Sequence, residues 1–234
     1  MATTLTQLPS EASSEGPNRA PTPATPRSTS SQRNSQNISN IQFPEKRQHP
    51  TSLSVYGPNL RDKWVIPDTP DTEDTLLIAD SNGVGLADYT PPSWHVAAYR
   101  GAHLSDVVRI LERCPIPTSV RTIVITVGIN DRTSSQHPLH NTMTRLKQLL
   151  SHQRDRHIHI LQLPVFEDSP PDLETGTHRI NEYLSDLFGD TSYPVEIPDG
   201  FLATRRRDGD HSHYSDDSCQ ILVGLLSTAV DNLN

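Results

Sequence analysis

Cysteine is scarce in this chain: Cys114 and Cys219 are the only two among 234 residues. Small secreted domains often depend on several disulfides, whereas a chain of this length can build a hydrophobic core without them. The N-terminal residues lack the basic segment and the following apolar run of a secretory signal peptide. We therefore expect reduced thiols and a location in the cytoplasm or the nucleus.

Apolar residues are also few, and they are unevenly distributed. They make up 33% of the chain, but about 24% of residues 1–70 against about 37% of residues 71–234. No run approaches the ~18 apolar residues of a membrane span, so we expect none. The first segment is rich in Ser, Thr and Pro and has no helical or strand period. We expect residues 1–70 to form a disordered Ser/Thr/Pro-rich tail and linker, and residues 71–234 to form one folded domain.

Positive charge is in deficit, since the formal net charge is -8. Most of the negative charge lies in the domain, and an acidic domain repels phosphate backbones and anionic lipid surfaces on average. A nucleic acid could be contacted only through the tail or through the run Arg205, Arg206 and Arg207. A solvated loop is the commoner interpretation of such a short run.

The folded part alternates short apolar runs with amphipathic stretches. The runs expected to be strands are residues 75–79, 95–99, 122–127, 157–163 and 193–197. The stretches expected to be helices are residues 103–114, 140–153 and 174–188, and a last helix that starts near Ser215. This alternation predicts an α/β fold, a three-layer α/β/α sandwich with a mostly parallel five-stranded sheet of the flavodoxin-like type.

Ligands of such sheets bind beyond the carboxyl ends of the strands, where the strand order reverses. Four loops qualify here: DSNGVG after the first strand, RGAH after the second, GINDR after the third, and DGDHSHYS before the last helix. Any chemistry of the domain is expected in these loops.

The glycines of the first loop do not make a nucleotide site. No Lys-Ser/Thr pair follows them, and Gly83 and Gly85 lack the third glycine of a dinucleotide-binding motif. The loop does place Ser81 directly after a strand, where its hydroxyl can point out of the sheet edge and its N–H can face a developing oxyanion. Taken alone, the serine is more often a helix N-cap.

The next two loops offer further oxyanion donors. Asn130 follows the third strand, and an amide N–H is a standard donor to an oxyanion. Turn formation is an equally good explanation of an Asn in that place. Gly101, after the second strand, can present its backbone N–H without a side chain in the way.

The last loop holds two acid–histidine pairs with the same spacing. Asp210 precedes His213 by three residues, and Asp208 precedes His211 by three. A carboxylate at this separation can hold an imidazole N–H, fix its tautomer and stabilise the imidazolium that forms when histidine takes a proton from serine. Spacing alone does not choose between the pairs.

Histidine pairs also raise the question of a metal site. Residues 157–159 and 211–213 are both His-x-His, but no Cys or carboxylate cluster completes a ligand set. We expect no metal and no organic cofactor.

Together the loops resemble a known family. Over roughly residues 75–230, IADSNGVGL, YRGAH, ITVGINDR and DHSHYSDDSCQIL are similar, in this order, to the four blocks of the SGNH (GDSL-type) hydrolase superfamily. The resemblance implies that Ser81 is the nucleophile, with Gly101, Asn130 and the Ser81 N–H forming the oxyanion hole. It also implies that His213 is the general base and acid and that Asp210 orients it.

The resemblance favours His213 over His211, because HYSDDSCQIL matches the family's run from histidine into the last helix. Two features depart from the family. Ala79 stands where the family has glycine, and the short stretch after Ser81 contains Pro91 and Pro92, so the first helix is expected to be reduced to a turn.

A second resemblance concerns the whole chain. A Ser/Thr/Pro tail and a Trp-x-x-Pro segment, Trp64 to Pro67, precede the domain, in a way similar to esterase-like domains encoded by vertebrate retroelements.

From the residues of the four loops we expect a serine ester hydrolase that acts on a small acyl ester. The alternative is a non-catalytic interaction module of the same fold in a retroelement-derived or RNA-associated complex. The ester substrate, the oligomeric state and the partner of the tail do not follow from the sequence.

Overall fold

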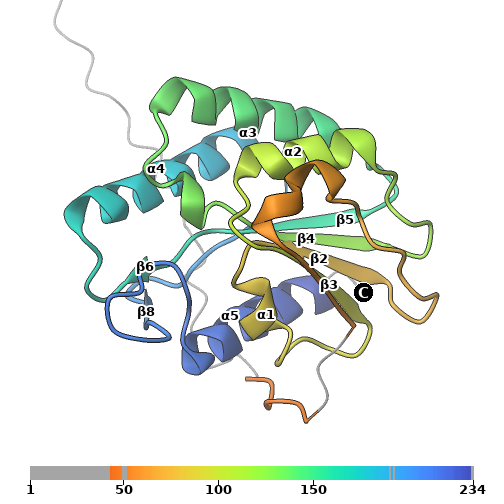
Figure 1. Cartoon of the computed structure of the whole chain (residues 1–234), viewed down its shortest axis with the longest axis horizontal. Coiled ribbons are helices and arrows are strands. Elements are labelled where there is room, and N and C mark those ends of the chain that lie inside the picture. Colours follow the sequence, from red (N-terminus) through yellow and green to blue (C-terminus); the bar gives the residue numbers. More distant parts are fainter. Residues whose placement is uncertain (1–42, 49–51, 190, 192, 233–234) are drawn as a thin grey trace, which may run out of the picture. The chain divides into compact units, whose positions relative to one another are not determined.

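The computed structural model describes residues 43–48, 52–189, 191 and 193–232, and its centre is a six-stranded parallel sheet (Figure 1). The strand order is β1-β3-β2-β4-β5-β7. The strands are β1 (Leu53–Tyr56), β2 (Thr75–Ala79), β3 (Trp94–Tyr99), β4 (Thr122–Thr126), β5 (His157–Leu161) and β7 (Pro194–Val195). Two short strands, β6 (Val165–Phe166) and β8 (Leu202–Ala203), pair separately in parallel.

Helices cover both faces of the sheet (Figure 1). One face carries α2 (Leu104–Arg113), α3 (Gln136–Ser151) and α4 (Pro171–Phe188); the other carries α1 (Gly83–Leu86) and α5 (Asp216–Asp231). Successive residues of a strand point to opposite faces, so Leu76 and Ile78 join the first core and Leu77 joins the second. The predicted three-layer α/β/α architecture is confirmed, and β3-β2-β4-β5-β7 has the flavodoxin-like order.

The number of strands differs from the sequence-based expectation of five. β1 pairs in parallel with β3, from Leu53 opposite Val96 to Tyr56 opposite Tyr99. It is a four-residue edge strand that is only partly buried, so it lacks the continuous apolar run by which the central strands were found. The sheet therefore has one strand more than predicted, and the additional strand is β1 at its edge.

The segment that sequence analysis assigns to the linker also packs against the domain. The Tyr56 and Tyr99 rings stack with centroids 4.7 Å apart. Trp64 is 1% exposed, and its indole N–H donates to Gly57 O at 2.9 Å. Residues 52–70 thus add a strand and part of the core, and the folded region begins before the boundary predicted at residue 71. Residues 1–42 of the tail and linker predicted over residues 1–70 lie outside the described residues.

For the two helices of the second face, the sequence predicts the start of α5 and the shortness of α1. Ser215 caps α5, since its side chain accepts a hydrogen bond from Ser218 N at 3.2 Å. α1 is a single turn, as the short segment after Ser81 predicts. A Cβ at Gly83 would lie 2.7 Å from Ala79 Cβ, so this turn sits directly on the sheet. Within the described part of the chain, no helix is long and apolar enough to cross a membrane.

Candidate active site

The side chains singled out in the four loops meet at the carboxyl edge of the sheet. Ser81 follows β2, Gly101 follows β3, Asn130 lies in the short 3-10 helix after β4, and His213 precedes α5. All four line one cavity of about 540 Å³. The other residues that line it are Pro58, Val84, Arg100, Arg206 and Ser212.

Asp210 lies behind His213 and holds its ring. His213 Nδ1 is 2.8 Å from Asp210 Oδ2 and 3.0 Å from Oδ1. The same carboxylate accepts the backbone N–H groups of Ser212 at 2.9 Å and His213 at 3.1 Å. Partial burial raises the pKa of Asp210, but these hydrogen bonds outweigh burial and hold the pKa below its usual value. The carboxylate is therefore charged at neutral pH and can stabilise an imidazolium at His213.

His211 is placed differently from His213. Its Nδ1 is buried and has no hydrogen-bond partner among the described residues, and its backbone carbonyl accepts from Arg132 Nη2 at 2.6 Å. His211 does not line the cavity. Of the two pairs that spacing left open, the structure brings together Asp210 and His213.

Three hydrogen-bond donors surround the Ser81 side of the cavity. The backbone N–H groups of Ser81 and Gly101 donate to no acceptor in the described part of the chain. Gly101 adopts a φ of 72°, and its carbonyl is held by Arg61 Nη2 at 2.8 Å. Asn130 donates one amide hydrogen to Ala102 O at 2.9 Å, which fixes the side chain and leaves a second hydrogen for a ligand. Donors of this kind can stabilise an oxyanion.

No hydrogen bond between the Ser81 hydroxyl and His213 is present among the described residues. The two side chains line the same cavity, with Ser81 half-buried. Hydrogen bonds between catalytic groups are often long without substrate and shorten when it binds. The arrangement places a serine hydroxyl and an imidazole in one cavity.

Asn82 connects these two groups, and sequence analysis missed it. Its Nδ2 donates to Ser212 O at 2.9 Å, and its Oδ1 accepts from Tyr214 N at 3.0 Å. Asn82 thus binds the residues on both sides of His213 while it follows Ser81 directly. Its partners lie 130 and 132 residues away, so no local pattern could have revealed this role.

Asp80 holds both the backbone and the side chain of Asn82 by hydrogen bonds. Its Oδ1 accepts from the Asn82 backbone N–H at 2.9 Å and from Nδ2 at 3.0 Å. The side chain is buried, and burial raises the pKa of Asp80 to about 6 despite these hydrogen bonds. Asp80 does not line the cavity; it positions Asn82 and, through it, the loop of His213.

Arg132 makes a second connection between loops. Its side chain is buried, with Nε donating to Ile129 O at 2.8 Å and Nη2 to His211 O. The guanidinium lies 5.9 Å from the centroid of the Phe166 ring. It therefore holds the loop of Asn130 against the loop of His213, and sequence analysis missed it as well.

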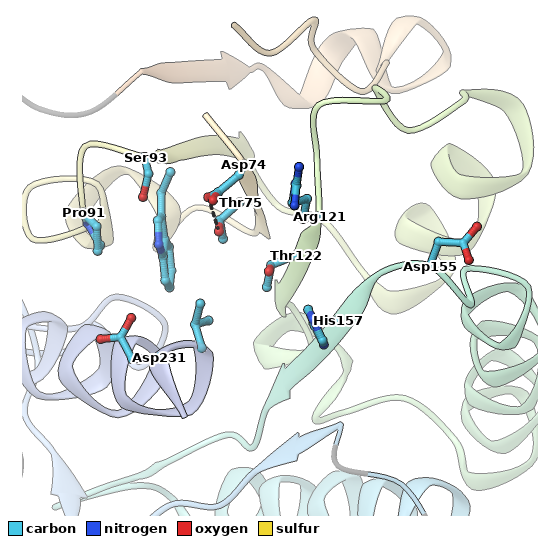
Figure 2. A pocket seen from close by; sticks show the side chains of 11 residues that line it. Asp74, Thr75, Pro91, Ser93, Arg121, Thr122, Asp155, His157 and Asp231 are labelled. Atoms are coloured by element: carbon cyan, nitrogen blue, oxygen red, sulfur yellow. Dashed lines mark hydrogen bonds between the residues drawn. The ribbon is translucent and has the colours of Figure 1, made fainter. Parts of the chain in front are cut away.

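A second cavity lies at the opposite edge of the sheet. It has a volume of about 330 Å³ and is lined by Asp74, Arg121 and His157, at the starts of β2, β4 and β5 (Figure 2). Asp74 Oδ1 accepts a hydrogen bond from the Thr75 hydroxyl at 3.0 Å. His157 forms no hydrogen bond or ion pair with a carboxylate of the described residues, and the cavity lies away from the edge where parallel sheets bind ligands. Nowhere in the described ranges do three His, Cys, Asp or Glu residues gather as metal ligands.

Comparison with known proteins completes the description of the fold. No protein-family profile and no curated protein sequence matches the chain. Among solved structures, a GDSL-like lipase from Bacteroides thetaiotaomicron matches with a TM-score of 0.54 and 11% identity, over 75% of this chain and 96% of that one. An acetylxylan esterase from Geobacillus stearothermophilus, solved as a catalytic mutant, matches with a TM-score of 0.51 and 14% identity, over 68% and 94%. The domain has the fold of the SGNH hydrolases.

A lipolytic protein of the G-D-S-L family from Veillonella parvula matches similarly, with a TM-score of 0.50 and 11% identity, over 66% of this chain and 96% of that one. At these identities the likeness concerns the SGNH fold alone. The chemistry of this domain has to be argued from its own cavity.

Proposed function

We propose that this SGNH-fold domain is a serine ester hydrolase with Ser81 as its nucleophile. The observation that carries the proposal is the common cavity of Ser81, His213 and three oxyanion donors, with Asp210 bonded to the far side of the imidazole. A helix N-cap at Ser81 and a turn at Asn130 would not require these side chains to meet in one cavity at the carboxyl edge of the sheet. The lipase and esterase activities named for the structural neighbours are in keeping with it.

The reaction would proceed in two halves. Ser81 Oγ attacks the ester carbonyl while His213 takes its proton, and the N–H groups of Ser81, Gly101 and Asn130 hold the oxyanion. The intermediate collapses, the alcohol leaves with the proton from His213, and the acyl group stays on Ser81. Water then attacks this acyl ester with His213 again as base, which releases the acid and restores the serine. Asp210 orients the imidazole and stabilises its charged form throughout.

The lining of the cavity supports a small acyl group. Val84 and Pro58 supply apolar surface beside Ser81, and the cavity of about 540 Å³ lies within the range of small-molecule sites. A short-chain ester such as p-nitrophenyl acetate is therefore the first substrate to test.

The test compares the wild type with Ser81→Ala. The substitution should lower kcat for p-nitrophenyl acetate at least ~10³-fold, with an unchanged circular dichroism spectrum. Turnover that persists in the variant would contradict the assignment. A well-folded wild type with no turnover of any ester would favour the non-catalytic interaction module.

A further inference from the structure

Two arginines line the cavity beside the catalytic groups. Arg100 precedes Gly101, and Arg206 lies in the loop that leads from β8 towards His213. No acidic side chain is among the residues that line the cavity. In a chain of net charge -8, the cavity is thus a local site of positive charge.

The backbones of both arginines are fixed in place. Arg206 N donates to His213 O at 3.0 Å, which ties the backbone of Arg206 to that of His213, the proposed general base. Arg100 N donates to Tyr56 O at 3.0 Å, and the next carbonyl, of Gly101, is held by Arg61. Both Cα atoms therefore have defined positions relative to Ser81.

The two guanidinium groups have no partner among the described residues. Neither forms an ion pair or a side-chain hydrogen bond with any described residue. The neighbours of Arg206 differ from it: Arg205 pairs with Asp168 at 2.7 Å, and the Arg207 side chain is 82% exposed and 3.7 Å from Asp210. Of the three-arginine run in the sequence, Arg205 and Arg207 each face a carboxylate. Arg206, which is also exposed, is the one that lines the cavity.

We infer that the natural substrate is an anionic ester, one that carries a carboxylate or phosphate which Arg100 and Arg206 bind while Ser81 attacks the ester group. This rests on the proposed function and adds a substrate class to it. Guanidinium groups bind carboxylate and phosphate through paired N–H donors. In an acidic domain, unpaired arginines at the site also attract anionic molecules over neutral ones.

The experiment measures a preference. The rate constant kcat/KM is determined for phenyl acetate, which is neutral, for 4-acetoxybenzoate and 4-acetoxyphenyl phosphate, whose charge lies on the alcohol side, and for monophenyl succinate, whose charge lies on the acyl side. The wild type is compared with Arg100→Gln, Arg206→Gln and the double variant. Arg154→Gln is the matched control, because it removes the same charge from an exposed loop before β5.

Each cavity substitution should lower the ratio of kcat/KM for an anionic ester to that for phenyl acetate by about three- to ten-fold. The ratio of the wild type should fall as salt is added, and Arg154→Gln should leave the ratio unchanged. The anionic ester with the largest loss shows which anion is bound and on which side of the ester bond it lies. Hydrolysis of all esters with ratios that no cavity substitution changes would overturn the inference and leave the hydrolase intact.

A binding measurement keeps the two proposals separable. Isothermal titration calorimetry of 4-acetoxybenzoate with Ser81→Ala requires no turnover. Adding Arg100→Gln and Arg206→Gln to this variant should weaken binding at least about ten-fold. Equal affinity in both proteins would overturn the inference, even if the wild type hydrolyses no ester.

Discussion

At the scale of single residues, the site depends on side chains that touch no substrate. Asn82 binds Ser212 O and Tyr214 N, so the loop of His213, the proposed base, is positioned by the residue next to Ser81, the proposed nucleophile. Asp80 holds Asn82 in turn. This chain of contacts joins the loop of Ser81 to the loop of His213.

Replacing Asn82 by Ala should therefore lower kcat about 10- to 100-fold, since small displacements of a catalytic group have effects of this size. KM should change much less. Steady-state kinetics measure the effect, and Asn141→Ala, which removes an exposed amide on α3, is the control. An Asn82→Ala enzyme whose kcat is unchanged would show that His213 is positioned without it.

Sequence reasoning reached Ser81, Gly101, Asn130, Asp210 and His213, but it missed Asn82 and Arg132, which connect the loops of the site. Ser81, Asn130 and His213 stand out because loops after strands carry chemistry. The partners of Asn82 lie 130 and 132 residues away in the sequence and become its neighbours only in the fold. Spacing alone did not choose between His213 and His211, because both have an aspartate three residues before them; the family resemblance favoured His213, which is the histidine that lines the cavity.

At the scale of elements, the turn after β2 is shaped by close packing. Gly83 opens α1 where a Cβ would meet the methyl groups of Ala79 at 2.7 Å and Ala98 at 3.0 Å. Both alanines belong to central strands, which cannot move aside. The absence of a side chain at Gly83 therefore allows α1 to pack directly against the sheet.

Gly83→Ala should accordingly lower the free energy of unfolding by about 1–3 kcal/mol. Urea denaturation measures the change. Gly57→Ala serves as the control, since a Cβ there meets nothing within 4 Å. Equal stability of the two variants would mean that the helix can shift without cost.

Elements also differ in how well their sequence predicts them. β2 and β4 are buried at every position and contain the apolar runs LLIA and IVI. β1 is mostly half-exposed and gains its hydrogen bonds from β3, so its sequence alone carries a weak signal. Whether such a segment forms a strand depends on its pairing with a strand that is distant in the sequence.

At the scale of the whole molecule, the domain extends upstream of residue 71. A protein of residues 71–234 would lack β1, the buried Trp64 and the Arg61 that holds Gly101. It should melt at a lower temperature than residues 43–234 and lose esterase activity. Thermal unfolding followed by circular dichroism tests this, and equal melting temperatures would place the boundary where the sequence pattern changes.

Stability should also depend on pH through His159. It is 3% exposed, and neither ring nitrogen has a partner among the described residues. Burial, with a smaller effect from His157, lowers the pKa of His159 to about 4. An unfolded histidine titrates near ~6.5, so between these values the unfolded chain binds more protons, and this contribution to stability is lost as pH falls.

His159→Leu removes this contribution. The variant should lose less stability than the wild type between about pH 7.5 and about pH 5, as measured by urea denaturation at both values. At the higher pH it should be about as stable or more so, because an unpaired polar group has been removed. Identical pH dependence in the two proteins would show that His159 is hydrated in solution.

The central claim is that Ser81 is an activated nucleophile, and a covalent probe tests it most directly. The wild type is treated with a fluorophosphonate, and the modified peptide is identified by mass spectrometry, with Ser81→Ala and Asp210→Asn treated in parallel. Labelling should occur on Ser81, disappear in Ser81→Ala and slow strongly in Asp210→Asn, whose imidazole loses its carboxylate. A folded wild type that stays unlabelled, or that is labelled on another serine, would contradict the account.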